Sequence, residues 1–180
     1  MTLLRFILIP LISLYPHMSL GHEFWIEPES YQIETDADLI AHLRNGEKFK
    51  GSSLAYFENR TARFEMIEEG QSSPLGGRMG DVPALQTTAP RDGLLILIHE
   101  TAASSLTYKE WEKFLKFAAH KDFPNAAAAH IANGWPQEQF RERYSRHVKA
   151  LFGVGTAKGA DIATGMKTEF VAITNPYDPS

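Results

Sequence analysis

The sequence predicts a mainly β protein, specifically an immunoglobulin-like β-sandwich with a helical insertion, and three observations support this. Apolar and polar residues alternate with a period of two between about residues 31 and 66, as in strands that bury one face. The run 94–98 is apolar throughout, which is typical of a strand buried on both faces. From residue 107 onward the apolar residues recur at helical spacing instead.

Residues 1–21 are predicted to be a cleaved signal peptide. Arg5 precedes a short apolar stretch, 6–15, and Ser19 and Gly21 supply the small residues that mark a cleavage site. The apolar stretch is too short to span a bilayer comfortably. We therefore expect an exported, periplasmic protein whose mature form begins at His22 and is not inserted in the membrane.

The first half of the mature chain is predicted to consist of short strands separated by turns. Alternating segments lie around 31–33, 39–44, 54–57 and 62–66. Asn45-Gly46 indicates a turn after the second of these segments. The segment 70–83 is rich in Gly, Ser and Pro and is expected to be an exposed loop.

Helices are predicted in the second half. Thr107 and Glu110 have the spacing of a capping box, which predicts a helix over about 108–120. A second short helix is expected over 126–131, and Pro136 can open a third through Phe140. Periodicity leaves open whether that third helix continues over 144–152 or yields to a strand. A loop over 153–165 and a last strand over 169–174 complete the chain.

The predicted organisation is one β-sandwich domain over 22–175, with the helical insertion around 107–145. The tail, 176–180, has the composition of a linker, and we expect it to lead to a second β-domain that this chain lacks.

Composition excludes several classes of function. The chain has no cysteine, so disulfides, thiolate metal sites and cysteine nucleophiles are excluded together. Its formal net charge of −4 argues against a general nucleic-acid binder. The nucleophile elbow, the phosphate loop, the dinucleotide fingerprint and the His-Glu-x-x-His motif are all missing. We therefore expect a protein that is not an enzyme.

The candidate metal ligands are His22, His99 and His147. After cleavage, His22 carries a free α-amine with a reference pKa of about 7.7 to 8.0 beside its imidazole, and these nitrogens can chelate one ion. His99 ends the buried run and could face a rim, although a structural role is the alternative. His147 is flanked by Arg146 and Lys149, whose charges disfavour a bound cation. Such nitrogen donors suit a divalent transition metal, either nickel, cobalt or copper.

Several stretches together resemble a bacterial exported family. The motif His-(Asp/Glu)-Phe-Trp-Ile-Glu-Pro after a leader is typical of that family, and here it occupies residues 22–28. Residues 108–114 and 142–151 resemble its Glu-Lys-Phe and Glu-Arg-Tyr-Ser-Arg segments, and 169–177 resembles its crossing into a second β-domain. Members are described as periplasmic components of cobalt or nickel ABC-type uptake systems. Some relatives carry tyrosine where His147 stands.

Three functions are consistent with these observations. The resemblance implies a periplasmic metal-ion-binding protein, accessory to nickel or cobalt uptake, with a membrane ABC-type importer as its partner. The second is a non-catalytic β-sandwich module that binds a protein or a glycan through the helical insertion, with Trp135 and Tyr144 as anchors. The third is a copper oxidase with a histidine brace, which requires a second histidine close to His22.

Overall fold

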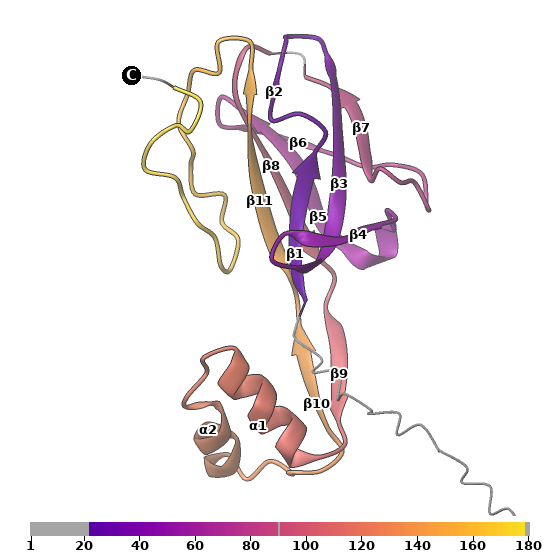
Figure 1. The fold of residues 1–180 in the computed structure, drawn as a ribbon, viewed down its shortest axis with the longest axis vertical. Helices are drawn as coiled ribbons and strands as arrows, with labels where there is room; N and C mark the ends of the chain where they lie inside the picture. Colours follow the sequence, from indigo (N-terminus) through magenta and orange to yellow (C-terminus); the bar gives the residue numbers. More distant parts are fainter. Residues whose placement is uncertain (1–21, 90, 179–180) are drawn as a thin grey trace, which may run out of the picture.

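The computed structural model describes residues 22–89 and 91–178. The predicted signal peptide, 1–21, lies outside these residues. The described part is mainly β, with several antiparallel sheets and two short helices (Figure 1). Within it, no helix combines the length and apolar character that a membrane-spanning segment requires.

The first sheet is formed by strands from the beginning of the chain. Its members are β1 (Glu23–Pro28), β3 (Asp38–Glu47), β4 (Lys50–Leu54) and β7 (Leu85–Thr88). β3 pairs antiparallel with each of the other three.

The turn between β3 and β4 corrects one prediction. The turn residues are Lys48 and Phe49, both with positive φ, and not Asn45-Gly46, which lies within β3. Gly46 pairs with Gly51 across the hairpin. A Cβ on Gly46 would lie 2.0 Å from the carbonyl oxygen of Lys50. The glycine therefore serves the close approach of two strands, which in sequence gives the same signal as a turn.

The second sheet is the larger of the two. Its strands, in spatial order, are β2 (Gln32–Ile33), β11 (His147–Val154), β8 (Gly93–Thr101), β5 (Thr61–Glu68) and β6 (Gln71–Pro74). β2 pairs parallel with β11, and the other pairs are antiparallel. A short 3-10 helix, η1 (Glu58–Arg60), leads into β5. The presence of β6 corrects the prediction that 70–83 is entirely loop.

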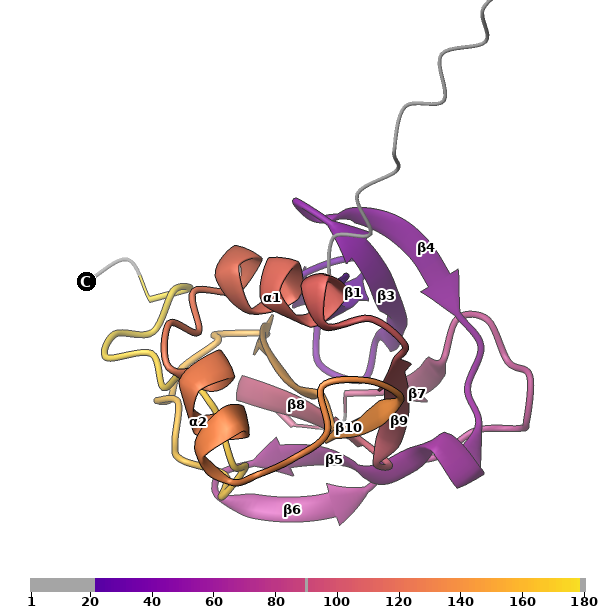
Figure 2. The same cartoon turned by 90° about the horizontal axis from the view of Figure 1, so that it is seen from below.

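Residues from both sheets form one apolar core. Figure 2 shows β3 and β4 on one side of the molecule and β5 and β6 on the other. Ile26, Leu39 and Leu43 contribute from the first sheet, and Leu97 and Phe152 from the second. A smaller cluster that includes Ile96, Ile98 and Met166 lies on the opposite face of the second sheet. β8 is therefore buried on both faces, as its continuous apolar run predicts. The predicted immunoglobulin-like strand order is not confirmed by these pairings.

A two-stranded stalk carries the helices away from the sheets (Figure 1). β9 (Ser104–Tyr108) and β10 (Phe140–Tyr144) pair antiparallel, and α1 (Trp111–His120) and α2 (Ala126–Ala132) form the tip. Aromatic rings hold the tip together. His130 packs against Phe140 at 4.4 Å between ring centroids, and its Nε2 lies 2.7 Å from the Pro136 carbonyl oxygen.

Three predictions in this half of the chain are wrong. Thr107 is not a helix cap, because it lies in β9 opposite Arg141, and α1 begins only at Trp111. The predicted third helix is β10, since pairing with β9 and burial of Phe140 decide its conformation. The predicted last strand, 169–174, is irregular. The segment left open by periodicity, 144–152, contributes most of β11.

The C-terminal segment, 157–178, lies along the outer face of the second sheet (Figure 1). The side chain of Met166 packs against Ile96 and Ile98, and the Tyr177 hydroxyl donates to the Leu151 carbonyl at 2.7 Å. At the start of β8, the Leu94 amide donates to the Lys158 carbonyl at 2.7 Å. This segment forms one wall of the candidate site.

Candidate functional site

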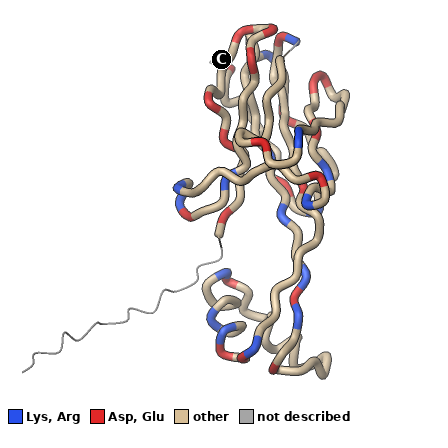
Figure 3. Tube along the Cα trace, turned by 90° about the vertical axis from the view of Figure 1, so that its right-hand side faces the viewer, with Lys and Arg blue, Asp and Glu red and all other residues tan. Residues whose placement is uncertain are grey.

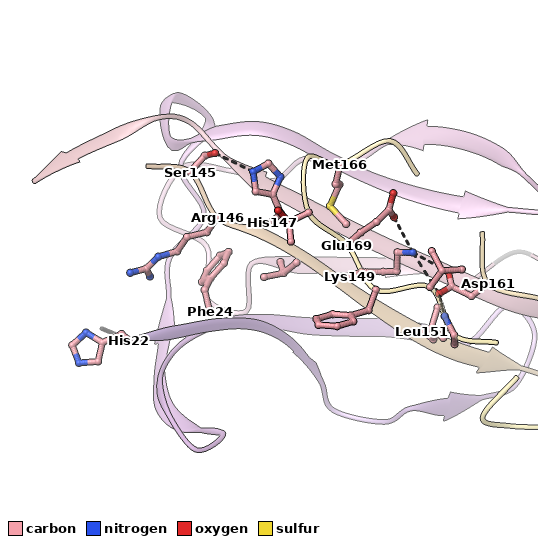
Figure 4. A pocket seen from close by; sticks show the side chains of 15 residues that line it. His22, Phe24, Ser145, Arg146, His147, Lys149, Leu151, Asp161, Met166 and Glu169 are labelled. Carbon is pink, nitrogen blue, oxygen red and sulfur yellow. Dashed lines mark hydrogen bonds and ion pairs between the residues drawn. The ribbon is translucent and has the colours of Figure 1, made fainter. Parts of the chain in front are cut away.

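A groove of about 600 Å³ opens where β1 begins, and we call it the N-terminal groove (Figure 4). It lies between the start of β1, the first half of β11 and the C-terminal segment. Its lining residues are His22, Phe24, Ser145, Arg146, His147, Val148, Lys149, Leu151, Asp161, Met166, Thr168, Glu169, Phe170, Val171 and Ala172. Two of the three predicted metal ligands, His22 and His147, are therefore residues of the same groove.

His22 occupies the outer rim of this groove. It is exposed and directly precedes β1, and β1 lies next to β11. In Figure 4 its imidazole points away from the groove, with Arg146 and Phe24 between it and His147. The fold thus brings these two histidines to one site without placing their rings in contact.

His147 stands on the groove wall with its ring mostly covered. Its Nε2 lies 3.0 Å from the Ser145 hydroxyl. Its Nδ1 lies 3.5 Å from a carboxylate oxygen of Glu100 and has no hydrogen-bond partner. A carboxylate behind one ring nitrogen is the usual second partner of a metal-binding histidine, because it orients the ring and makes the other nitrogen more basic.

The floor of the groove is an ion-pair network. Lys149 Nζ lies 3.1 Å from Asp161 and 3.0 Å from Glu169, and all three side chains are nearly buried. Burial alone favours the neutral form of Glu169. The Thr164 amide, Lys149 and the Thr164 hydroxyl nevertheless donate to it and hold its pKa at about 2. The network fixes the C-terminal segment to β11.

Glu100 also belongs to a second group of charged side chains, centred on Arg63. Arg63 lies 3.4 Å from Glu100 and 2.8 Å from Glu65, and it also donates to the Thr164 carbonyl at 2.9 Å. A hydrogen bond from Arg63 lowers the pKa of Glu65 below its usual value, although burial opposes this. Glu100 is therefore shared between Arg63 and His147, which fixes its orientation.

His99 does not line the N-terminal groove. It lies 2 % exposed in the core, with its ring 5.5 Å from that of Phe24 and 5.2 Å from that of Phe64. Burial lowers its pKa from 6.5 to about 4, so the ring is neutral at physiological pH. It contributes instead to a different cavity at the root of the stalk, where its Nδ1 has no partner.

The described residues contain no group of three or more His, Asp and Glu side chains placed to hold a metal ion. Sequence reasoning missed Glu100 and Ser145 as partners of His147, and Met166 as a lining residue of the groove. The sequence signals only Ser145, two residues before His147, because Glu100 and Met166 arrive through long-range pairing and packing.

The fold and groove define a mainly β protein with a projecting helical tip and a histidine-containing groove at its N-terminal end. The chain belongs to the family described as domain of unknown function (DUF4198), whose model matches residues 19–179. No curated protein and no solved structure matches the chain.

Proposed function

We propose that the protein binds a divalent transition-metal ion in the N-terminal groove, as a periplasmic β-sandwich carrier that is accessory to nickel or cobalt uptake. The observation that carries the proposal is the position of His22 on the rim of the groove whose wall holds His147. Cleavage before His22 creates an α-amine at the same rim.

Three nitrogen donors are then available to one ion. The amine and the imidazole of His22 form a chelate, and His147 Nε2 supplies the third donor from the groove wall. Glu100 stands 3.5 Å behind His147 Nδ1, where it can accept the proton that fixes this tautomer. Because His22 is exposed and precedes β1, its side chain can turn toward the groove without disturbing the sheet.

Two cations lie near His147, and each has partners of its own: Lys149 is paired with Asp161 and Glu169. Arg146 lines the groove, but its Nη1 donates to Asn45 at 2.7 Å and its guanidinium lies over the Tyr144 ring. These contacts hold the guanidinium, which lies between His22 and His147 in Figure 4. Nitrogen donors of this kind bind Co(II), Ni(II) and Cu(II) with affinity that rises in that order, so the choice between them depends on which metal is present.

The proposed role is delivery and not catalysis. A carrier of this kind would pass its ion to a membrane ABC-type importer, in line with the resemblance described above. The exposure of His22 at the rim supports transfer, because this ligand is not enclosed by the fold.

The test compares Ni(II) binding by three forms of the protein in calorimetric titrations. The first form begins at His22, the second carries one extra alanine before His22, and the third is His147→Gln. Extension keeps the imidazole but converts the amine to an amide, a poor ligand until it is deprotonated. We expect both changes to weaken binding by at least about tenfold, the equivalent of one lost ligand interaction. His120→Gln, on the helical tip, serves as the matched control.

Equal affinity in the native and extended forms would refute the amine chelate. Equal affinity in native protein and His147→Gln would remove His147 from the site. Affinity should also fall as the pH falls, because metal binding requires the donors to lose their protons.

A second function is favoured by the helical tip. Phe123, Ile131 and Trp135 are each more than half exposed there, at the end of a stalk that projects from the sheets (Figure 1). Exposed aromatic side chains suit recognition of a protein or a glycan. Quenching of tryptophan fluorescence by soluble oligosaccharides, compared between native protein and Trp135→Leu, tests this function. A signal that is lost in the variant would support it, and no response in native protein would count against glycan binding.

A further inference from the structure

Arg146 places a positive charge in the proposed metal site. It lines the N-terminal groove, and in Figure 4 it lies between His22 and His147, the two residues proposed to bind the ion. Its Nη1 donates to Asn45 at 2.7 Å, and its guanidinium lies 5.6 Å from the centre of the Tyr144 ring. Among the ion pairs of the described residues, none includes Arg146. A group that is charged at every physiological pH therefore lies between the donors of a dication.

The acidic residues of the groove do not offset this charge. Asp161 and Glu169 are nearly buried, and both pair with Lys149. Each also accepts hydrogen bonds from backbone amides of the C-terminal segment. Within the described lining of the groove, Arg146 is thus the permanently charged side chain that lacks an opposite charge beside it.

A bare ion fits this arrangement poorly. The guanidinium repels a dication held by His22 and His147, because like charges at short range raise the energy of the complex. The three proposed nitrogen donors also do not complete the square-planar or tetragonal shell that is typical of Ni(II) and Cu(II). An anionic ligand on the ion removes both difficulties. It fills the open positions, and it offers a carboxylate that a guanidinium binds through paired hydrogen bonds.

The groove has room for such a ligand. Its volume of about 600 Å³ exceeds what one ion needs and lies within the range of small-molecule sites, about 300 to 1,000 Å³. Phe24, Leu151 and Met166 make part of the lining apolar. The carbon skeleton of an organic ligand can cover this surface, whereas an inorganic anion would leave it in contact with water. The lining therefore favours an organic carboxylate.

We infer that the N-terminal groove accepts its ion as an anionic chelate with a small organic polycarboxylate. The chelating groups of this ligand fill the positions that His22 and His147 leave open, and a free carboxylate pairs with Arg146. The inference rests on the proposed metal site and names the form in which that site receives its cargo. Arg146 then determines specificity, because it binds the chelate and repels the bare ion.

The test measures how much nickel and labelled citrate the protein that begins at His22 retains in ultrafiltration. Citrate is the probe because its nickel complex is an anion with a carboxylate to spare. The complex of nickel with one ethylenediamine molecule is the matched control, since it remains a cation. We expect nickel and citrate to be retained in equal amounts, and citrate without nickel to pass through. The ethylenediamine complex should bind at least about tenfold more weakly.

Arg146→Gln separates the chelate from the bare ion. The variant should retain nickel citrate at least about tenfold more weakly than native protein. Bare Ni(II) should bind to it at least as tightly as to native protein, because a repelling charge is gone. Binding of bare Ni(II) also shows that the variant is folded. Arg141→Gln, which changes an exposed arginine of β10 outside the groove, should alter neither affinity.

The inference is overturned if citrate is not retained with nickel, if the ethylenediamine complex binds as tightly, or if Arg146→Gln retains nickel citrate as well as native protein. Equal loss of bare and citrate-bound nickel in Arg146→Gln also overturns it, because Arg146 would then act on the fold and not on the ligand. If native protein binds bare Ni(II) in these cases, the carrier function stands and the inference alone fails. If native protein binds neither form of nickel, the carrier function fails and the inference fails with it.

Discussion

Replacing Lys149 with methionine removes the cation that fixes the C-terminal segment to β11. Lys149→Met keeps the length of the side chain and leaves Asp161 and Glu169 without their shared partner. In the native protein the side chains of Lys149, Asp161 and Glu169 are 8 %, 2 % and 11 % exposed, so water replaces the lost charge poorly. The substitution therefore acts on a nearly buried ion pair.

The expected loss of stability is about 3 kcal/mol, the lower end of the range for breaking a buried pair. The lower end applies because both carboxylates keep other donors. Asp161 still accepts from the Ile162 and Ala172 amides, and Glu169 still accepts from the amides of Thr164 and Gly165. Without those bonds, two unpaired buried carboxylates would cost more.

Urea denaturation followed by circular dichroism measures this loss. A change of about 3 kcal/mol lowers the unfolding midpoint by about 1.5 M at a typical urea dependence for a small protein. Lys113→Met is the matched control, because Lys113 pairs with Glu110 at 2.8 Å on the exposed face of the tip. Such a surface pair contributes less than about 1 kcal/mol.

The pH dependence provides a second check on the same reasoning. The pKa of Glu169 is lowered to about 2, so its contribution is complete above about pH 4.5 and is lost as the pH falls toward 2. Without the Lys149 hydrogen bond, which lowers the pKa of Glu169, this carboxylate takes up a proton more easily. The difference between native and variant protein should therefore shrink below pH 4.5. Equal midpoints for native protein and Lys149→Met at pH 7 would refute the account of the C-terminal segment.

Three further changes test other parts of the structure. Burial lowers the pKa of His99 to about 4. Below pH 6.5, His99 therefore takes up a proton in the unfolded chain but stays neutral in the folded protein until the pH approaches 4. Native protein should lose about 2 kcal/mol more than His99→Gln between pH 6.5 and pH 5, and parallel stability curves would contradict this. Phe140→Ala removes the centre of the aromatic cluster and should cost about 3 kcal/mol, seen as early loss of helical circular dichroism; an unchanged thermal transition would show that the tip does not depend on that ring. Thr107→Ala changes an exposed strand position and should alter stability by less than about 0.5 kcal/mol; a loss near 1 kcal/mol would restore the helix cap that the sequence suggests.

The predictions that hold are those that depend on strong local patterns. The apolar run 94–98 lies in a strand buried on both faces, because successive side chains of a strand point to opposite faces and each face of β8 meets an apolar cluster. The alternating segment 39–44 lies within β3 for a similar reason, since one face meets the core and the other does not. The two short helices are likewise present where apolar spacing indicates them.

The predictions that fail involve partners distant in sequence. Pro136 and the spacing around Phe140 favour a helix locally, but pairing with β9 and packing against His130 override that preference. Phe170 and Ile173 suggest a strand, yet they are almost fully exposed and the segment around them is held by Lys149 and Thr164 instead. Local sequence contains no signal for either outcome.

The candidate site was partly predictable. His22 follows from the predicted cleavage site and His147 from its residue type alone, but their common groove depends on β11 lying beside β1. Glu100 reaches His147 only because β8 pairs with β11 in a register that places the two residues opposite each other. His99 lies within β8, two residues before the strand ends, and not at its end as expected. Its ring lies among aromatic side chains and lines the cavity at the root of the stalk.

Figure 3 places the acidic and basic residues along the whole molecule, and charges of both signs are spread over the sheets, the stalk and the tip. Among the residues coloured there, neither sign of charge is confined to one part of the fold. Recognition of a metal ion would therefore depend on the local donors of the N-terminal groove.

The most direct test of the carrier function is an anomalous-diffraction map of crystals of the protein beginning at His22, grown with Ni(II). The account predicts one strong peak bounded by the amine and imidazole of His22 and by His147 Nε2. A peak held only by other histidines, such as His42 or His120, would contradict it, and so would a map without bound nickel.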